Sequence, residues 1–387
     1  MLFENTKTAF SIKKNSDLLK SKFIYKILSS SIISKIGTGI IKLAIKIKLP
    51  IKRLVKATLF NHFCAGENYE ESSVTVRDLG EKKIFSVLDY SVEAGYKEES
   101  FERFLSKKIA TIEFSKKSKY MPFVVFKPSC FGRSSLFEKL SKGGSLSDLE
   151  KNEWNRVKKR FEEAISYAIN SKVKIMVDAE ESWNQKIIDR LMESLMSKYN
   201  REEIWVFNTL QMYRKDRLNY LSKLIKKSNK ENFKLGIKLV RGAYLEAENL
   251  RAKKMNYKSP ICKSKEETDK NFDTAVNLIL KNLDKILLFV GTHNESSIYK
   301  LMDWMQLNKI STNHPNIWFA QLYGMGDHIT FNLASEKFRA VKYIPFGPIK
   351  EVLPYLIRRA EENSSVDSNS KRELELINKE LKRRKVS

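Results

Sequence analysis

Two adjacent arginines near the C-terminus occur at a spacing that a helix would convert into one binding face. In the expected helix 348–363, a polar stripe of Tyr355, Arg358, Arg359 and Glu362 follows the spacing i, i+3, i+4, i+7. Guanidinium groups bind carboxylates through paired hydrogen bonds, which fix orientation as well as charge. The stripe is consistent with an anion clamp, although the spacing alone leaves a solvated charged face open.

Polar side chains also occur at the ends of most short apolar runs, upstream of that helix. They are Asp89, Lys127, Asp178, Gln211, Arg241, Thr292, His293, Asn294 and Gln321, with Tyr343 midway along its run. In a (β/α)8 barrel, the C-terminal ends of the strands form the catalytic face. The pattern therefore predicts a catalytic rim built from several strands.

The elements that must position these residues are eight apolar runs separated by segments long enough for crossover helices. The expected strands are 84–89, 123–127, 173–178, 204–207, 235–240, 286–291, 317–320 and 341–344. Repeated βα units with eight strands predict an α/β protein with a (β/α)8 TIM barrel. We expect this barrel at 83–363, after a helical N-terminal arm at 1–82 and before a polar, charged tail at 364–387.

Composition and charge narrow the class of protein further. The chain has 387 residues, 42% hydrophobic and 30% charged, with a net charge of +26. The lysines are scattered, so we expect no nucleic-acid binding, and attraction to an anionic membrane surface stays open. Cys64, Cys130 and Cys262 form no CxxC pair, and the histidines lack metal-ligand spacing, which favours a reducing compartment and no metal.

The N-terminal region has neither the apolar core of a signal peptide nor an Arg-rich leader. The apolar stretch 32–49 contains four lysines, which makes a membrane span costly and leaves a packed helix or an interfacial membrane helix. We expect a cytoplasmic protein, with peripheral attachment to the inner membrane left open. A GxGxxG fingerprint in a strand-turn-helix context is missing, which disfavours a Rossmann-bound cofactor.

Three segments together resemble motifs of the proline dehydrogenase family. They are KLVRGAYLEAE (238–248), AQLYGMGD (320–327) and YLIRRAEEN (355–363). Four more segments support the resemblance in the family's order: VFKPSCFGR (125–133), VDAEES (177–182), NTLQMYRKD (208–216) and GTHN (291–294). The resemblance is to the stand-alone, FAD-dependent form and covers most of the chain. It implies a distorted barrel whose last helix lies over the strand ends.

The resemblance also implies a substrate site for L-proline. Arg358 and Arg359 would hold the carboxylate, and Lys127 would lie at the same end of the substrate. Tyr343 and Tyr355 would wall the ring, and Leu322 would pack on its apolar carbons. Asp178 would organise Lys127 or a nearby arginine, with direct action as a base left open.

The flavin site implied by the resemblance takes residues from several strand ends. They are Gln211, Lys238, Val240, Arg241, Gly242, Ala243, Tyr244, Thr268, Thr292, His293, Asn294, Gln321 and Glu362. Gly242 and Ala243 leave the backbone bare for close approach of a cofactor. Lys238 and Arg241 would offset negative charge on the pyrophosphate or on the reduced ring system. Many family members have arginine where this chain has Lys238, while the mitochondrial type has lysine.

The resemblance implies oxidation of L-proline to 1-pyrroline-5-carboxylate, with electrons passed to a quinone. A separate dehydrogenase would oxidise the product, since no aldehyde dehydrogenase domain fits in this length. Oxidation of hydroxyproline or another cyclic amine is the alternative within the class. A basic binding protein for nucleic acid or membrane is the alternative outside it.

Overall fold

The computed structural model describes residues 1–29, 52–92, 95, 97–363 and 370–386. They belong to two compact units: a terminal unit made of 1–93 and 320–387, and a central unit made of 94–319. The helix expected within 32–49 lies outside the described residues. The terminal unit thus joins the two ends of the chain, which the sequence analysis treated as a separate arm and tail.

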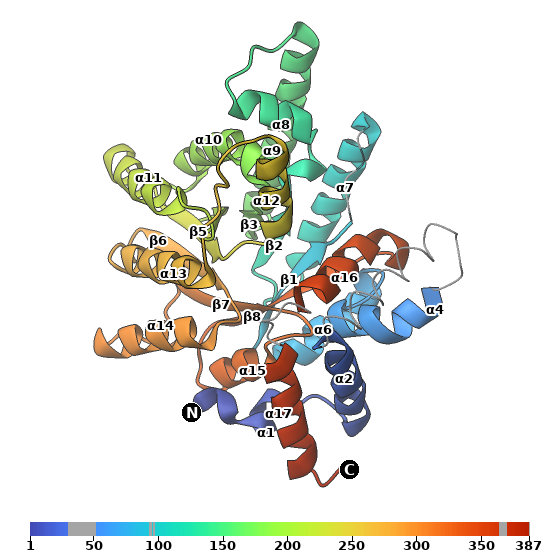
Figure 1. Cartoon of the computed structure of the whole chain (residues 1–387). Coiled ribbons are helices and arrows are strands. Elements are labelled where there is room, and N and C mark those ends of the chain that lie inside the picture. The colour runs from blue at the N-terminus through green and yellow to red at the C-terminus, as the bar shows by residue number, and fades with distance from the viewer. Residues whose placement is uncertain (30–51, 93–94, 96, 364–369, 387) are drawn as a thin grey trace. The chain divides into compact units, whose positions relative to one another are not determined.

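The central unit alternates strands and helices from its beginning to its end. Its elements are α7 (Glu98–Ser115), β2 (Phe123–Phe126), η3 (Pro128–Cys130), α8 (Ser134–Ser141), α9 (Asp148–Asn170), β3 (Lys174–Val177), α10 (Ser182–Tyr199), β4 (Val206–Gln211), α11 (Arg217–Glu231), β5 (Leu235–Val240), α12 (Leu245–Lys254), α13 (Lys265–Leu280), β6 (Ile286–Gly291), α14 (Glu295–Leu307) and the first part of β7 (Ile317–Leu322). Strands β2 to β6 pair in parallel in chain order. Figure 1 shows helices such as α10, α11 and α13 outside these strands.

Aromatic side chains from four strands fill the interior of the central unit. The Phe123 ring packs edge-on against Phe207, Phe289 and Trp318, with centroid distances of 5.6, 5.3 and 4.9 Å. Edge-to-face packing suits the aromatic quadrupole and adds to the benefit of burial. Packed aromatic rings therefore fill this part of the interior.

The terminal unit carries the remaining strands and the helices of both chain ends. Its elements are η1 (Leu2–Glu4), α1 (Thr6–Ala9), α2 (Asn15–Leu28), α4 (Lys52–Val55), η2 (Lys56–Phe60), α5 (Asn61–Phe63), α6 (Tyr69–Glu81), β1 (Phe85–Tyr90), the end of β7, α15 (Asp327–Ser335), β8 (Ala340–Phe346), α16 (Ile349–Asn363) and α17 (Ser370–Arg383). Strands β1 and β8 pair in parallel from Phe85↔Val341 to Tyr90↔Phe346.

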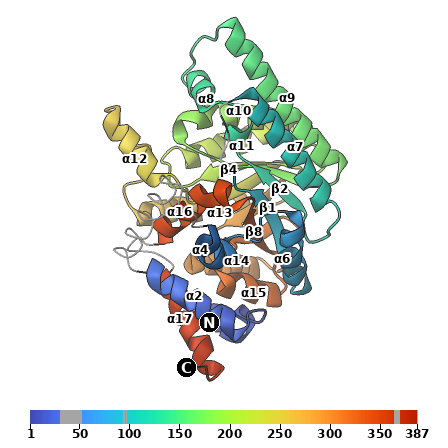
Figure 2. The ribbon, with the colours of Figure 1, turned by 90° about the vertical axis from the view of Figure 1, so that its right-hand side faces the viewer.

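Helices α2 and α17, from opposite ends of the chain, lie side by side in both ribbon views (Figures 1 and 2). The sequence analysis placed a polar, charged tail at 364–387, but within it α17 buries Leu376, Ile377 and Leu381 on one face. These side chains belong to one hydrophobic cluster with Tyr25 of α2 and Tyr355 of α16. The C-terminal helix is therefore part of the core of this unit.

All eight strands form one sheet in the order β1-β8-β7-β6-β5-β4-β3-β2. From β2 to β8, each strand is a neighbour of the next along the chain, and β1 pairs with β8, which is the strand order of a nearly closed (β/α)8 barrel. The predicted fold class is confirmed. Strands β5 and β6 begin and end where the sequence pattern placed them.

The fourth strand is the clearest error of the sequence analysis, which placed it at 204–207. Strand β4 starts at Val206 and continues to Gln211. The Asn200 side chain accepts hydrogen bonds from the backbone N–H groups of Trp205 and Val206, both at 2.9 Å, at the start of the ladder. Polar residues continue the strand because their partners are inside the fold, as when Thr209 Oγ1 donates to the Val177 carbonyl at 2.7 Å.

Candidate functional site

A buried ion pair joins strand β5 to the end of strand β3 in the central unit. The Lys238 Nζ lies 2.6 Å from Asp178 Oδ1, and both side chains are largely shielded from solvent. Strand β4 lies between these strands in the sheet. Lys238 is therefore a partner of Asp178 that the sequence analysis did not foresee, since it assigned this lysine to the flavin.

Glu180, two residues after Asp178, organises the ends of three neighbouring strands. Its carboxylate accepts from the Ser129 N–H at 2.8 Å and from the Ser129 hydroxyl at 2.6 Å. Its backbone carbonyl accepts from Gln211 Nε2 at 2.7 Å. Burial raises the pKa of Glu180 to about 7, although the Ser129 hydrogen bonds and the charge of Lys127 oppose the shift. Lys127 itself is half-buried directly after β2.

The turn after β5 presents bare backbone. Gly242 has φ +134°, and a Cβ there would lie 2.5 Å from the Tyr213 ring, so only glycine fits. The next residue, Ala243, is exposed, and its N–H points to Gln211 Oε1 at 3.4 Å. Val240 ends the strand, and its carbonyl accepts from the Met212 N–H at 2.8 Å. Tyr244 then precedes α12 as its N-cap residue.

Arg241 is held by residues of α13 and α14 and by the end of β6. Its guanidinium lies 2.6 Å from Asp269 and donates to Thr292 Oγ1 at 2.5 Å and to Ser297 Oγ at 3.0 Å. It also lies over the Phe272 ring, 4.4 Å from the centroid. This arrangement fixes the side chain before any ligand binds.

Three other predicted flavin residues shape the local backbone. Asn294 caps α14 by accepting from the Ser297 N–H at 3.1 Å, and half-buried His293 precedes it. Thr268 donates its hydroxyl to the Ser264 carbonyl within α13, at 3.1 Å. This bond lies at the start of the helix, and the assignment of Thr268 to the flavin site stays a prediction.

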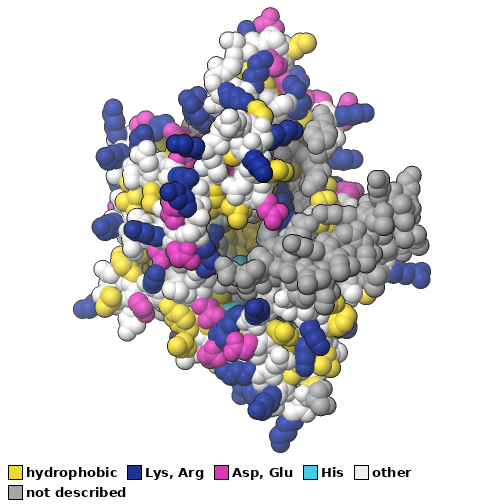
Figure 3. Space-filling model, viewed as in Figure 1, with side chains coloured by type: hydrophobic (Ala, Val, Ile, Leu, Met, Phe, Trp, Pro, Cys, Tyr) yellow, Lys and Arg dark blue, Asp and Glu magenta, His cyan; other side chains and the backbone are white. Residues whose placement is uncertain are grey.

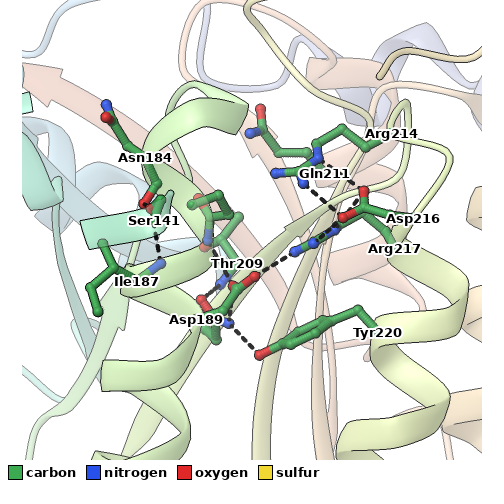
Figure 4. Close-up of polar contacts among 12 residues, drawn as sticks. Ser141, Asn184, Ile187, Asp189, Thr209, Gln211, Arg214, Asp216, Arg217 and Tyr220 are labelled. Atoms are coloured by element: carbon green, nitrogen blue, oxygen red, sulfur yellow. Dashed lines mark hydrogen bonds and ion pairs between the residues drawn. The ribbon is translucent and has the colours of Figure 1, made fainter. Parts of the chain in front are cut away.

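A cluster of charged residues anchors β4 to the helices around it, and we call it the Asp189 cluster (Figure 4). Asp189 of α10 accepts from Arg217 at 2.7 Å, from Asn208 at 3.0 Å and from Gln185 at 2.8 Å. Arg217 also pairs with Asp216. Asn208 therefore faces the helices, and the alternation of side chains directs Thr209 and Gln211 to the other side of the strand.

The terminal unit contains the predicted residues of the final two strands and of α16. Gln321 is buried and accepts from Thr330 Oγ1 at 2.7 Å. Leu322 is partly buried against the hydrophobic cluster that includes Tyr355. The carbonyl of Tyr343, a buried residue of β8, accepts from the Tyr323 N–H at 2.8 Å.

On α16, the polar stripe is sheltered from solvent instead of facing it. Arg359 is 7% exposed, and its guanidinium lies 5.4 Å from the centroid of the Tyr355 ring. Arg358 is half-buried, whereas the side chain of Glu362 lies outside what the structure describes. Arg359 is thus shielded from bulk water and Arg358 partly so, and their role as an anion clamp stays a prediction.

Sequence reasoning missed Glu180 and the carboxylate partner of Arg241, which is Asp269. Glu180 stands inside the quoted segment VDAEES, so its spacing from Asp178 was an available signal. Asp269 follows Thr268 in an ordinary helix pattern and gave none. Within the described residues, no cluster of three or more His, Cys, Asp and Glu could hold a metal ion, and none of the helices is long and apolar enough to cross a bilayer.

Comparison with known proteins places this arrangement in a family. Residues 73–372 match the family model described as proline dehydrogenase. Over 324 residues, the chain is 38% identical to the carbapenem antibiotics biosynthesis protein CarD of Pectobacterium carotovorum subsp. carotovorum, covering 84% of each chain. It is 32% identical to the mitochondrial proline dehydrogenase 1 of Dictyostelium discoideum, over 98% of this chain and 74% of that one.

A solved structure of similar fold is proline utilization A (PutA) from Bdellovibrio bacteriovorus, inactivated by N-propargylglycine. The TM-score is 0.72 at 17% identity, over 97% of this chain and 38% of that one. The chain thus spans well under half of that larger protein, and the likeness shows the (β/α)8 fold alone. The match of the family model over most of its length, with these relatives, shows that this chain belongs to the proline dehydrogenase family.

Proposed function

We propose that this protein oxidises L-proline to 1-pyrroline-5-carboxylate with FAD as cofactor and a quinone as electron acceptor. The observation that carries the proposal is Arg359, which is buried on α16 beside Tyr355 in a chain of the proline dehydrogenase family. A guanidinium held away from bulk water binds a carboxylate more strongly than an exposed one, because the local dielectric is lower.

Arg358 and Arg359 would hold the proline carboxylate, with Lys127 at the same end. The aromatic faces of Tyr343 and Tyr355 and the side chain of Leu322 would enclose the apolar ring carbons. The contacts to the carboxylate would fix the orientation of the substrate. The contacts to the ring carbons would discriminate between rings of different size.

Most residues of the proposed flavin site belong to the central unit. The turn at Gly242 has no side chain, and the exposed Ala243 donates its N–H to Gln211 Oε1 at 3.4 Å. Lys238 and Arg241 supply positive charge for the pyrophosphate or the reduced ring. The other members of the proposed set in this unit are Gln211, Val240, Tyr244, Thr268, Thr292, His293 and Asn294. Two further members, Gln321 and Glu362, belong to the terminal unit.

A bound flavin would supply the acceptor for a hydride from the ring carbon beside the nitrogen. Loss of the amine proton to water would then leave a carbon–nitrogen double bond in the product. Asp178 and Lys238 present opposite charges in a fixed geometry, which costs no reorganisation as charge shifts during the reaction. Asp178 would orient its cationic partner.

The proposal extends to partners outside this chain. The acceptor is a membrane quinone, reached through peripheral contact with the inner membrane surface. The imine product is handed to a separate pyrroline-5-carboxylate dehydrogenase.

The test is an anaerobic titration of the purified protein with L-proline, followed by flavin absorbance. We expect yellow protein whose absorbance near 450 nm bleaches as proline is added. Protein that stays colourless and inactive after addition of FAD would contradict the proposal.

Replacing Arg358 by Met removes one guanidinium while keeping an unbranched, mostly aliphatic side chain. We expect the apparent KM for proline to rise by about two orders of magnitude, since a charge-assisted pair to the carboxylate is lost. Lys350→Met, at an exposed position on the same helix, is the control and should leave KM unchanged. An Arg358→Met enzyme with the wild-type KM would remove this arginine from the substrate site.

A second substrate is favoured by one relative. The hydroxyproline dehydrogenase of Xenopus laevis is 33% identical over 257 residues, 65% of this chain and 54% of that one. A panel of L-proline, hydroxyproline and other cyclic amines decides between them through kcat/KM.

The alternative of a basic binding protein needs lysines and arginines gathered in one patch. On the face that Figure 3 shows, they are dispersed among acidic and apolar side chains. We therefore propose that the protein does not bind nucleic acid. A binding assay with DNA and RNA tests this, and we expect no binding at low or at high salt.

A further inference from the structure

The two helices from opposite ends of the chain contact the loop that connects β7 to α15, residues 323–326. This loop follows Leu322, the residue proposed to pack on the substrate ring. Helix α2 reaches it through Tyr25, whose hydroxyl donates to the Gly324 carbonyl at 2.5 Å. Helix α17 reaches it through Glu373, whose carboxylate accepts from the Gly326 N–H at 2.5 Å.

The loop can adopt only a narrow range of conformations. Gly324 has φ +81°, and a Cβ there would lie 2.2 Å from the carbonyl oxygen of His62. Gly326 also has positive φ, at +64°. Backbone of this kind has few interactions of its own to stabilise it, so its conformation depends on the partners that hold its carbonyl and N–H groups.

Ionic contacts hold the C-terminal end of the loop. We call Asp327, Lys342 and Lys13 the Asp327 cluster. Asp327, the first residue of α15, lies 2.7 Å from Lys342 of β8 and 2.7 Å from Lys13, which precedes α2. Lys342 is 1% exposed and also donates to the Met325 carbonyl at 2.5 Å. Glu373 is buried, with His328 of α15 at 3.7 Å.

The same elements carry three of the proposed substrate contacts. Leu322 precedes the loop, and the Tyr323 N–H bonds to the carbonyl of Tyr343. Met325 belongs to the hydrophobic cluster that contains Tyr355, Tyr25 and Leu376. A shift of the loop would therefore be transmitted to Leu322, Tyr343 and Tyr355 together.

We infer that Tyr25 and Glu373 are positioning residues, through which the paired terminal helices hold the β7–α15 loop in the conformation that lets Leu322 and Tyr343 measure the substrate ring. The inference rests on the proposed function for the identity of the substrate. It assigns the two ends of the chain a part in substrate recognition, beyond their part in stability.

The experiment uses the full chain with two variants. Tyr25→Phe removes the hydroxyl that donates to Gly324, and Glu373→Gln turns the charge-assisted hydrogen bond from the Gly326 N–H into a weaker neutral one. Tyr167→Phe, in the central unit, and Glu375→Gln, exposed on α17, are matched controls. Steady-state kinetics with L-proline and with hydroxyproline are measured for each, with flavin content. Hydrogen exchange is followed in peptides that cover residues 322–327.

We expect both test variants to raise KM for proline about tenfold while kcat changes less than about threefold, and to reduce discrimination between the two substrates. Amides of the loop should exchange faster than in the controls. Unchanged KM, unchanged discrimination and unchanged loop exchange would overturn the inference, even if the melting temperature falls. A wild-type enzyme that does not oxidise proline contradicts the proposed function instead, and loop exchange then still decides whether the helices hold the loop.

Discussion

The two units each contain a buried charged cluster, and the origins of their residues differ. The Asp189 cluster takes its residues from α10, β4 and α11, which are consecutive elements of the β/α repeat. The Asp327 cluster combines β8 and α15 with Lys13, from the N-terminal end of the chain. Glu373 of α17 is close to the same helix, through its contact with His328.

This difference separates two uses of buried charge. A cluster made within the repeat can be replaced or lost with consequences for the stability of that repeat alone. A cluster that recruits segments outside the repeat makes a loop at a strand end depend on those segments. We therefore expect damage to the Asp189 cluster to reduce stability, and damage to the Asp327 cluster to change both stability and substrate recognition.

The largest expected effect follows Arg217→Met. Arg217 is 5% exposed, pairs with Asp189 and Asp216, and lies over the Tyr220 ring. Removing it leaves the buried Asp189 carboxylate without its cation, at a cost in unfolding free energy toward the upper end of roughly 3–5 kcal/mol. Urea unfolding measures the loss, and the KM for proline of the folded protein should stay within about twofold of wild type.

Arg214→Met is the matched control, since Arg214 pairs with the half-exposed Asp216 and should cost about 1–2 kcal/mol. Arg217→Lys provides a milder variant if the methionine variant does not fold. A large rise in KM for Arg217→Lys would break the comparison, because it would give the Asp189 cluster a part in substrate recognition.

Within the Asp327 cluster, the two lysines should differ in effect. Lys342→Met removes a cation that is 1% exposed, and we expect a loss of about 3 kcal/mol because Lys13 still pairs with Asp327. Lys13→Met removes a cation whose side chain is 21% exposed and should cost only about 1–2 kcal/mol. Both should raise KM for proline, Lys342→Met more. If Lys342→Met and Lys13→Met both lower the free energy of unfolding and neither changes KM, the Asp327 cluster serves stability alone, as we expect of the Asp189 cluster.

Much of the barrel was predictable from the sequence because buried parallel strands read as short apolar runs. Strands β5 and β6 illustrate this, since most of their residues are apolar, and helix α16 was predicted from its apolar stripe. Strand β4 was misplaced because Asn208, Thr209 and Gln211 look like loop residues until their partners are known. The pattern of one segment carries no information on partners in another.

The same reason explains what was missed in the candidate site. The arginine stripe on α16 could be identified from spacing within one helix. The Asp178–Lys238 pair joins residues 60 positions apart, and the bond from Tyr25 to Gly324 joins residues 299 apart. The segment that forms α17 looked like a polar tail because glutamates such as Glu373 and Glu380 are rarely buried without partners. In the fold, Gly326 and Arg383 supply those partners.

The smallest expected effect is the pH dependence of stability that Glu180 causes. This buried carboxylate accepts hydrogen bonds from Ser129, whereas Asp327 pairs with two lysines. The two lysines are among the causes that hold the pKa of Asp327 well below its usual range, so its stabilising contribution is present above about pH 4 and is lost in stronger acid. Burial raises the pKa of Glu180 from 4.5 to about 7. The folded state then binds this proton more tightly than the unfolded chain, and stability falls as pH rises between these two values.

Glu180→Gln should remove that loss, because the amide keeps a hydrogen-bonding group but cannot ionise. We expect its melting temperature, relative to wild type, to rise by about 3–6 °C between pH 5 and pH 8. Scanning calorimetry at both pH values measures the difference, with Glu202→Gln at an exposed position as control. Taking differences between variants cancels the titration of all other groups. Parallel curves for Glu180→Gln and wild type would mean that Glu180 ionises as readily when folded as when unfolded, and that the hydrogen bonds from Ser129 offset its burial completely.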